Sequence, residues 1–411
     1  MKSFLKDIKN SAHVAALLES SLKNSILSQM AAALRVNCVK IIDENKKDLA
    51  NGKKNSLSYA LMDRLFLDES RVEGMALAIN EIASLREPVG RILDGWVVQS
   101  GLKIEKVSIP IGVIAIIYES RPNVTSDTAA LCFKSGNACV LKGGKEAQYS
   151  NKIIADILQT VLMTNNLPKE MISLLPDSTR EGVAALVQMD KYVDLVIPRG
   201  GEGLIKFISQ NATIPVVKHD KGVCHIYLDK SANIQNAIKI AINAKCQKPS
   251  ACNSMETLLV HAQIAKDILP LLKAEFEINE TELKGCSKTQ KIIDIKPATK
   301  EDFHTEYLAK ILNIKVVENV DEAIEHINFY SSNHSEAIIT ENYTIGEKFL
   351  NSVDSACVYI NASTRFTDGG EFGYGAEVGI STNKLHSRGP MGINDLTTFK
   401  FKVYGNGQAR K

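Results

Sequence analysis

The stretch Gly112-Val-Ile-Ala-Ile-Ile-Tyr118-Glu-Ser-Arg-Pro-Asn123 joins an uninterrupted apolar run to a polar loop that contains proline. The same succession of a short apolar strand, a polar loop and an amphipathic helix recurs as far as residue 229. Further strands are expected at 138–141, 172–175, 193–197, 215–217 and 225–228. Helices are expected near 125–134, 146–163, 179–189 and 202–211. Strands that are apolar on both faces suit a parallel sheet covered by helices on each side, so the sequence predicts an α/β domain here.

The loops that follow these strands are rich in Gly, Arg, Lys and hydroxyl side chains: 118–123, 142–145, 176–180 and 198–201. Ligands of parallel sheets bind beyond the carboxyl ends of the strands. The pair Gly143-Gly144 before a helix could hold a phosphate on its N–H groups, although such a pair is more often only a turn. A P-loop signature is absent, which disfavours ATP hydrolysis. Together the loops indicate a site for a phosphorylated ligand.

Further along the chain, Cys252 stands in the stretch 243–261, on a loop between a helix expected at 232–245 and a strand expected at 255–260. A thiol on an irregular loop among small and polar residues can be reached by a substrate and ionised by nearby N–H groups. The alternative is that Cys252 is a loop thiol without a catalytic role, which is the default interpretation for the other seven cysteines. We expect Cys252 to be a nucleophile. The elements that follow it are a helix at 262–276 and strands near 314–317 and 336–339, which indicate a second α/β domain.

Two segments outside the α/β repeats alternate apolar and polar residues. Residues 95–110 have the pattern of a hairpin around Ser100-Gly101, and residues 396–404 have that of a single strand. We expect the two elements to pair with each other and with another subunit, so that the protein forms at least a homodimer. Residues 1–92 carry apolar side chains at helical spacing and are predicted to be helical.

The composition excludes several other classes of protein. The chain has 411 residues, 45% of them hydrophobic, and is long enough for more than one domain. A net charge of +2 argues against a dedicated nucleic-acid or membrane-surface role, and no segment is apolar enough to span a bilayer. Residues 1–18 lack the apolar run of a signal peptide. The eight cysteines are scattered without zinc-ligand spacing, so we expect no metal, and free thiols in a reducing cytoplasm.

Several longer motifs carry a resemblance to a known family. They are Ile109-Pro-Ile-Gly-Val-Ile114, Tyr118-Glu-Ser-Arg-Pro-Asn-Val-Thr125, Lys134-Ser-Gly-Asn-Ala138, Ile197-Pro-Arg-Gly-Gly201, Cys252-Asn-Ser-Met-Glu-Thr257, Asn361-Ala-Ser-Thr-Arg-Phe366 and the stretch from Gly373 to Pro390. In this order, over essentially the whole chain, they resemble the gamma-glutamyl phosphate reductases (glutamate-5-semialdehyde dehydrogenases) of the aldehyde dehydrogenase superfamily.

The resemblance implies an aldehyde dehydrogenase-like α/β fold with three parts. A Rossmann-like cofactor-binding domain would comprise 1–94 and 111–225, with 372–392 returning to it. An α/β catalytic domain would comprise 226–371, and a β oligomerisation flap 95–110 and 393–411. The implied reaction begins when Cys252 attacks the acyl carbon of L-glutamyl 5-phosphate and expels phosphate. NADPH then reduces the thioester, and L-glutamate 5-semialdehyde leaves for proline biosynthesis.

The resemblance also assigns residues to the cofactor, NADPH. Lys142 would hold the adenosine ribose, with Gly144 in the same loop, and Lys145 would favour the 2′-phosphate of NADPH. The pair Gly200-Gly201 would approach the pyrophosphate or the nicotinamide, and Glu306 would hold the nicotinamide ribose. The alternatives are a solvated lysine for Lys145, a tight loop for the glycines and a surface carboxylate for Glu306.

Asn123 matches, with some slack in the alignment, the superfamily asparagine whose amide helps to hold the oxyanion of the reacting carbonyl group. The backbone N–H of Cys252 would be the second donor. The alternative for Asn123 is a turn residue after Pro122.

Five residues are expected to bind the substrate: Arg121, Ser363, Thr364, Arg365 and Arg388. The three arginines are candidates because bidentate guanidinium geometry fits both the phosphate and the α-carboxylate. The sequence leaves open which arginine binds which anion.

One departure from the oxidising aldehyde dehydrogenases is informative. Their general-base glutamate would fall near Val217-Lys-His-Asp220, where no glutamate stands. Hydrolysis of a thioester needs an activated water, whereas an acyl phosphate provides phosphate as the leaving group, so the loss favours phosphate chemistry. Cys246 and Lys248 also replace the Thr and Arg that the family more often shows, and Lys248 could alter anion contacts.

Two other functions stay open at this point. The nearer one is another thioester-forming aldehyde dehydrogenase, acting on a different acyl phosphate or on an acyl-coenzyme A. The more distant one is a catalytically silent partner of glutamate 5-kinase, against which the intact Cys252 motif and the cofactor loops argue. A complex with that kinase leaves no signal in the sequence.

Overall fold

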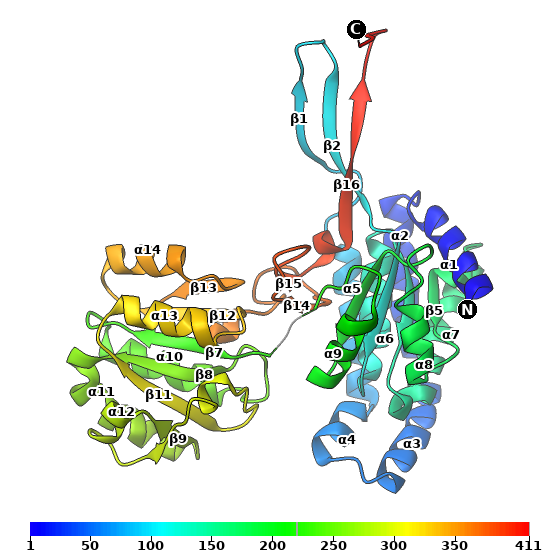
Figure 1. Cartoon of the computed structure of the whole chain (residues 1–411). Helices are drawn as coiled ribbons and strands as arrows, with labels where there is room; N and C mark the ends of the chain where they lie inside the picture. The colour runs from blue at the N-terminus through cyan, green and yellow to red at the C-terminus, as the bar shows by residue number, and fades with distance from the viewer. Residues whose placement is uncertain (219–220, 411) are drawn as a thin grey trace. The chain divides into compact units, whose positions relative to one another are not determined.

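The computed structural model describes residues 1–218 and 221–410. The chain folds into two compact units, which we call the first and the second unit (Figure 1). The first comprises Met1–Lys218, Gly373–Gly379 and Met391–Lys411, and the second comprises His219–Phe372 and Ile380–Pro390. Both are built from helices and parallel sheets, so the α/β prediction is confirmed.

A four-stranded parallel sheet forms the centre of the first unit, in the order β5-β4-β3-β6. Its strands are β3 (Val113–Tyr118), β4 (Ala138–Lys142), β5 (Ile172–Leu174) and β6 (Leu195–Arg199). The prediction of a further strand at 215–217 is wrong, because this described stretch joins the sheet through one bridge alone, between Val196 and Val216. Pro215 lacks the N–H that a longer ladder would need.

The helices of the first unit are α1 (Lys2–Ala15), α2 (Ser20–Val36), α3 (Cys38–Lys54), α4 (Tyr59–Leu65), α5 (Glu69–Ser84), α6 (Pro122–Lys134), α7 (Gln148–Thr164), α8 (Arg180–Leu186) and α9 (Glu202–Asn211), with short 3-10 turns η1 (Lys145–Ala147), η2 (Lys169–Met171) and η5 (Ile393–Leu396). They cover both faces of the sheet. Alternate residues of a strand point to opposite faces, and here both sets are apolar and buried by helices. Ile114 and Ile116 pack with α2, α5, α6 and α7, whereas Val113 and Ala115 pack with α1, α8 and α9.

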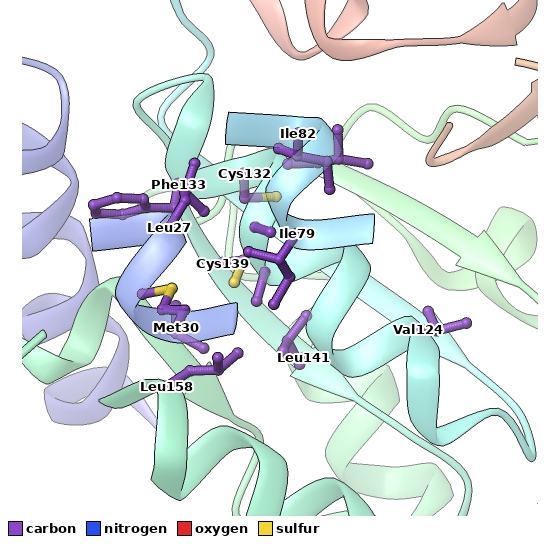
Figure 2. Packing of buried hydrophobic residues seen from close by; sticks show 14 of the residues in the cluster. Leu27, Met30, Ile79, Ile82, Val124, Cys132, Phe133, Cys139, Leu141 and Leu158 are labelled. Carbon is purple, nitrogen blue, oxygen red and sulfur yellow. The ribbon is translucent and has the colours of Figure 1, made fainter. Parts of the chain in front are cut away.

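The core on the first of these faces explains why the N-terminal helices belong to this unit. Leu27 and Met30 of α2 and Ile79 of α5 meet Cys139 and Leu141 of β4, and all five are fully buried (Figure 2). Burying one such aliphatic side chain contributes about 1.5–3 kcal/mol, so the N-terminal helices are held firmly on the sheet. Within the described residues no single helix is long and apolar enough to cross a membrane; α2 and α3 meet both criteria only as a pair bent by 67°.

A seven-stranded sheet forms the centre of the second unit, in the order β10-β9-β11-β8-β7-β12-β13, with every neighbouring pair parallel. The strands are β7 (Cys224–Leu228), β8 (Met255–His261), β9 (Glu282–Gly285), β10 (Lys296–Pro297), β11 (Ile311–Val317), β12 (Ser335–Ile339) and β13 (Cys357–Ile360). The helices are α10 (Ile234–Cys246), α11 (Ala262–Ile278), α12 (Ser287–Gln290), α13 (Val320–Tyr330) and α14 (Tyr343–Ser352), with turns η3 (Asp302–His304) and η4 (Thr364–Phe366). Helices α10 and α11 pack on one face, α13 and α14 on the other.

A third, antiparallel sheet consists of β1 (Ile92–Val97), β2 (Lys103–Pro110) and β16 (Thr397–Tyr404), and we call it the flap (Figure 1). Strand β16 pairs with β2 along its whole length, from Thr397 opposite Pro110 to Tyr404 opposite Lys103. The predicted pairing of the two alternating segments is therefore confirmed. Their pairing with another subunit stays a prediction.

The segment 372–392 differs from expectation. The sequence assigned all of it to the first unit, but residues 380–390 belong to the second. One set of contacts that attaches these residues to the second unit is made by Asp354, whose carboxylate forms ion pairs with both Lys384 and Arg388. Strands β14 (Gly379–Ser381) and β15 (Gly389–Met391) form a two-stranded sheet at the two ends of this excursion.

Candidate functional site

The loops beyond β3, β4 and β6 of the first unit lie together, as expected for the carboxyl ends of neighbouring parallel strands. The backbone N–H of Glu119 donates to the carbonyl of Arg199 at 3.3 Å, and the Glu119 carboxylate accepts from the N–H of Gly201 at 3.0 Å. The N–H of Ser120 donates to the carboxylate of Glu146 at 2.9 Å. Two glutamates therefore bind backbone N–H groups in these loops.

Two glycines of these loops are closely packed against glutamate side chains. A Cβ on Gly144 would lie 2.0 Å from Oε1 of Glu146, and one on Gly200 would lie 2.7 Å from Cδ of Glu119. Gly201 differs, because nothing lies within 4 Å of the same position. A ligand could therefore approach the backbone at Gly201, whereas the space at Gly144 and Gly200 is taken by protein carboxylates.

The two lysines of the β4 loop have different surroundings. Lys142 is half-buried; burial lowers its pKa, and the charges of Glu146 and Glu119 counteract this. Lys145 is exposed at the start of η1. Burial alone would raise the pKa of Glu146, but hydrogen bonds from Ser120 and the charge of Lys142 hold it below its ordinary value. The loop thus combines a half-buried lysine and glutamate of opposite charge with one exposed cation.

Arg121 and Asn123 lie at the start of α6, where Arg121 is the exposed N-cap residue. The Asn123 side chain is also exposed, and its Nδ2 donates to Oδ2 of Asp127 one turn later, at 3.0 Å. Burial raises the pKa of Asp127 to about 6, against the hydrogen bonds from Asn123 and Ser126. An amide has two N–H donors, so Asp127 orients Asn123 and leaves the other N–H to a further acceptor.

Cys252 of the second unit lies on the predicted loop, between the end of α10 and the start of β8, and is half-exposed. The loop packs tightly on the start of β7, because a Cβ on Gly222 would lie 1.9 Å from the carbonyl oxygen of Cys252. That oxygen accepts a hydrogen bond from Sγ of Cys224 at 3.3 Å. Burial raises the pKa of the Cys224 thiol well above its ordinary value. Of these two neighbouring thiols, Cys224 is thus held protonated and Cys252 is the accessible one.

A segment distant in sequence, Ser363–Thr367, which we call the clamp, fixes the residue that follows Cys252. Nδ2 of Asn253 donates to the carbonyl oxygens of Thr367 at 2.8 Å and of Arg365 at 3.3 Å, although Asn253 and Arg365 are 112 positions apart. Oγ1 of Thr364 returns a hydrogen bond to the carbonyl of Asn253 at 2.7 Å. Nη1 of Arg365 donates to Oδ1 of Asn253, and its Nε donates to Gln247 at 2.8 Å.

The remaining candidates of the second unit lie on other loops. Glu306 stands between η3 and β11. Burial raises the pKa of Glu256 to about 7 against the opposing effect of Lys245, and the negative charge of Glu306 adds to the rise. The guanidinium of Arg388 donates to Asp354 at 2.9 Å. Hydrogen bonds from Lys384 and then from Arg388 hold the pKa of Asp354 below its ordinary value. The structure therefore brings Ser363, Thr364 and Arg365 to the nucleophile loop and anchors Arg388 on Asp354.

Several residues at these places were missed by sequence reasoning. Asn253 and the buried ion pair between Lys245 and Glu256 were not singled out, nor were Cys224 and Asp127. A signal for the ion pair did exist, because Lys245 falls on the buried face of α10 with Ala237 and Ala241, where an unpaired charge would be costly. Nothing in the sequence says that Thr367 lies beside Asn253.

Two further expectations concern the missing general-base glutamate and metal binding. His219 and Asp220, in the stretch where the general-base glutamate is missing, lie outside the described residues. In the residues that are described, no group of three or more His, Cys, Asp or Glu side chains could hold a metal ion. All eight cysteines are free thiols.

Comparison with known proteins supplies the family. Residues 15–292 match the model of the aldehyde dehydrogenase family. The chain is 68% identical to the gamma-glutamyl phosphate reductase of Sulfurimonas denitrificans and 59% identical to that of Wolinella succinogenes, over 100% of both chains in each case. A crystal structure of the gamma-glutamyl phosphate reductase from Thermotoga maritima is 44% identical, with a TM-score of 0.98 over 100% of this chain and 99% of that one. The chain therefore belongs to the aldehyde dehydrogenase family, and within it to the gamma-glutamyl phosphate reductases.

Proposed function

We propose that the protein reduces L-glutamyl 5-phosphate to L-glutamate 5-semialdehyde and phosphate with NADPH, as a step of proline biosynthesis. The observation that carries the chemistry is the half-exposed Cys252 on a loop that is fixed by Asn253 and the clamp. The names of full-length relatives support the choice of substrate. A cytoplasmic location fits the eight free thiols.

The proposed first step is attack by the Cys252 thiolate on the acyl carbon. The new C–S bond forms, the C–O bond to phosphate breaks, and phosphate leaves with the electron pair. NADPH, when bound, supplies the hydride that reduces the thioester. The negative charge that develops on the substrate oxygen would be stabilised by the N–H of Cys252 and by the second amide N–H of Asn123. Collapse of this oxyanion releases the aldehyde and the thiolate, so no external base is consumed.

The first unit is proposed to bind the cofactor. Its residues fit a phosphorylated dinucleotide, because Lys145 is exposed and the space at Gly201 is open. Lys145 would bind the 2′-phosphate and Lys142 the adenosine ribose. Gly144 and Gly200 would act indirectly, since their missing side chains make room for the glutamates that shape the loops. Glu306 of the second unit would hold the nicotinamide ribose.

The second unit is proposed to bind the substrate beside the nucleophile. Ser363, Thr364 and Arg365 would do so, because the clamp that carries them is bonded to the residue after Cys252. Arg365 would bind one substrate anion with the guanidinium N–H groups that do not bond Gln247 or Asn253. Arg121 and Arg388 are further candidates for the two anions. The flap is proposed to join subunits, and a kinase that phosphorylates the glutamate side chain would supply the substrate.

The test is the reverse reaction: phosphate-dependent reduction of NADP⁺ by glutamate semialdehyde, followed at the nicotinamide absorbance. Wild type and Cys246→Ala, which removes a neighbouring thiol, should turn over. Cys252→Ala should lose at least ~10³-fold, as enzymes do without their nucleophile. Turnover without phosphate would indicate a hydrolytic dehydrogenase, and turnover that needs coenzyme A instead would indicate an acyl-coenzyme A substrate. No turnover in any protein would refute the proposal.

A further inference from the structure

A buried ion pair closes the loop that carries Cys252. Nζ of Lys245, in the last turn of α10, lies 2.6 Å from Oε2 of Glu256, the second residue of β8. Their side chains are 0% and 1% exposed. The two residues flank residues 246–255, so their contact fixes both ends of the nucleophile loop at one point.

The other oxygen of the same carboxylate reaches a different loop. Oε1 of Glu256 accepts a hydrogen bond from the backbone N–H of Leu308 at 3.4 Å. Leu308 has a φ of 52°, in the left-handed region that a leucine rarely adopts, and it is half-exposed. A residue in such a conformation persists only where its surroundings hold it there. Glu306, the proposed ligand of the nicotinamide ribose, stands two residues earlier.

Stability alone does not explain this pair. Replacing a buried ion pair by apolar side chains of similar volume is often neutral or stabilising, because both charges pay a desolvation penalty. An apolar pair could not accept the Leu308 N–H, however. The distinctive property of Glu256 is that one side chain bonds both the base of the nucleophile loop and the loop of Glu306.

We propose that Glu256, held by Lys245, is a positioning residue that sets the place of Glu306 relative to Cys252 within the second unit. This inference rests on the proposed function, in which Glu306 binds the cofactor. With its side chain 1% exposed, Glu256 would act through the Leu308 backbone and not by direct contact with substrate or cofactor.

The test compares two double variants by fluorescence titration with NADPH, which needs no turnover. Lys245→Met/Glu256→Leu keeps the packing but removes the acceptor for Leu308, and its Kd for NADPH should rise about tenfold or more, a usual effect of losing an outer supporting contact. Lys245→Gln/Glu256→Gln keeps an acceptor without charge and should stay within about threefold of wild type. The matched control is Lys273→Met/Glu277→Leu, the same change at a surface ion pair of α11.

Glu256→Asp covers the case in which the Met/Leu variant does not fold. It keeps a negative charge that the flexible Lys245 side chain can follow, but withdraws the carboxylate by about 1.5 Å, one C–C bond, from the fixed Leu308 N–H, and should also weaken NADPH binding. The inference is overturned if a folded Met/Leu variant, or Glu256→Asp, binds NADPH as wild type does. It is also overturned if the Gln/Gln variant or the surface control is weakened as much as Met/Leu. Wild-type NADPH binding without glutamyl phosphate reduction would refute the proposed function but leave this comparison valid.

Discussion

Replacing Asn253 by alanine tests whether the clamp fixes the nucleophile loop. The side chain of Asn253 is 3% exposed and bonds the clamp at three points: two carbonyl oxygens through Nδ2 and the Arg365 guanidinium through Oδ1. Alanine removes all three bonds and leaves a buried Thr367 carbonyl without this donor. The hydroxyl bond from Thr364 to the backbone of residue 253 is retained.

The expected magnitude follows from the kinds of bond lost. A neutral hydrogen bond contributes about 1 kcal/mol net, and one to a charged group about 1.5–3 kcal/mol. The bond to the Arg365 carbonyl is long at 3.3 Å and counts for less. We therefore expect Asn253→Ala to lower the free energy of unfolding of the second unit by about 3 kcal/mol. The loop should open more often, and Cys252 should react faster with an alkylating reagent.

Urea unfolding followed by circular dichroism measures the first effect, and iodoacetamide labelling with peptide mass spectrometry measures the rate at Cys252. Asn279→Ala is the matched control, because its amide makes one exposed hydrogen bond to Glu275 in the same unit. It should cost less than about 1 kcal/mol and leave the labelling rate unchanged. If Asn253→Ala costs no more than Asn279→Ala, the clamp does not fix the loop.

Further expectations concern pH, assembly and the cofactor. Burial lowers the pKa of His326 to about 2, so the unfolded chain binds a proton below about pH 6.5 that the native state does not bind. The free energy of unfolding should therefore fall by up to ~1.4 kcal/mol per pH unit below that value. His326→Phe should reduce this pH dependence, as measured by urea unfolding at several values between pH 5 and 7.5. Trp96 and Phe401 of the flap are 41% and 53% exposed, and their ring centroids lie 6.1 Å apart in an edge arrangement. Because such exposed apolar side chains mark interaction surfaces, wild type should sediment as a dimer or larger species and Phe401→Lys as a smaller one. A wild-type monomer at micromolar concentration would contradict this. Lys145→Glu should lower the ratio of kcat/KM for NADPH over NADH by about tenfold or more, and an unchanged ratio would remove Lys145 from the 2′-phosphate site.

The α/β layout of both units was predictable because each strand has a local signature. The strand of Val113 to Tyr118 is apolar at every position, and its residues are buried on both faces of the sheet. The strand predicted at 215–217 was wrong because a short apolar run has the same sequence pattern whether it forms a full strand or a single bridge. The division of 372–392 between the two units could not be predicted, because contacts such as that between Asp354 and Arg388 leave no local pattern in the sequence.

By itself, the sequence determined the α/β class, the loop position of Cys252 and the pairing of the flap strands, because apolar periodicity, turn residues and motif order are local properties. The tertiary structure alone decided what surrounds each candidate. In the folded protein, Asn253 is hydrogen-bonded to the clamp, glutamate side chains occupy the space beside Gly144 and Gly200, and Lys245 is buried against Glu256. These contacts join residues from different elements, and they form only when packing of the sheets and helices brings those elements together. Polar side chains that become buried on folding need hydrogen-bond partners, and the fold decides which groups are close enough to be those partners.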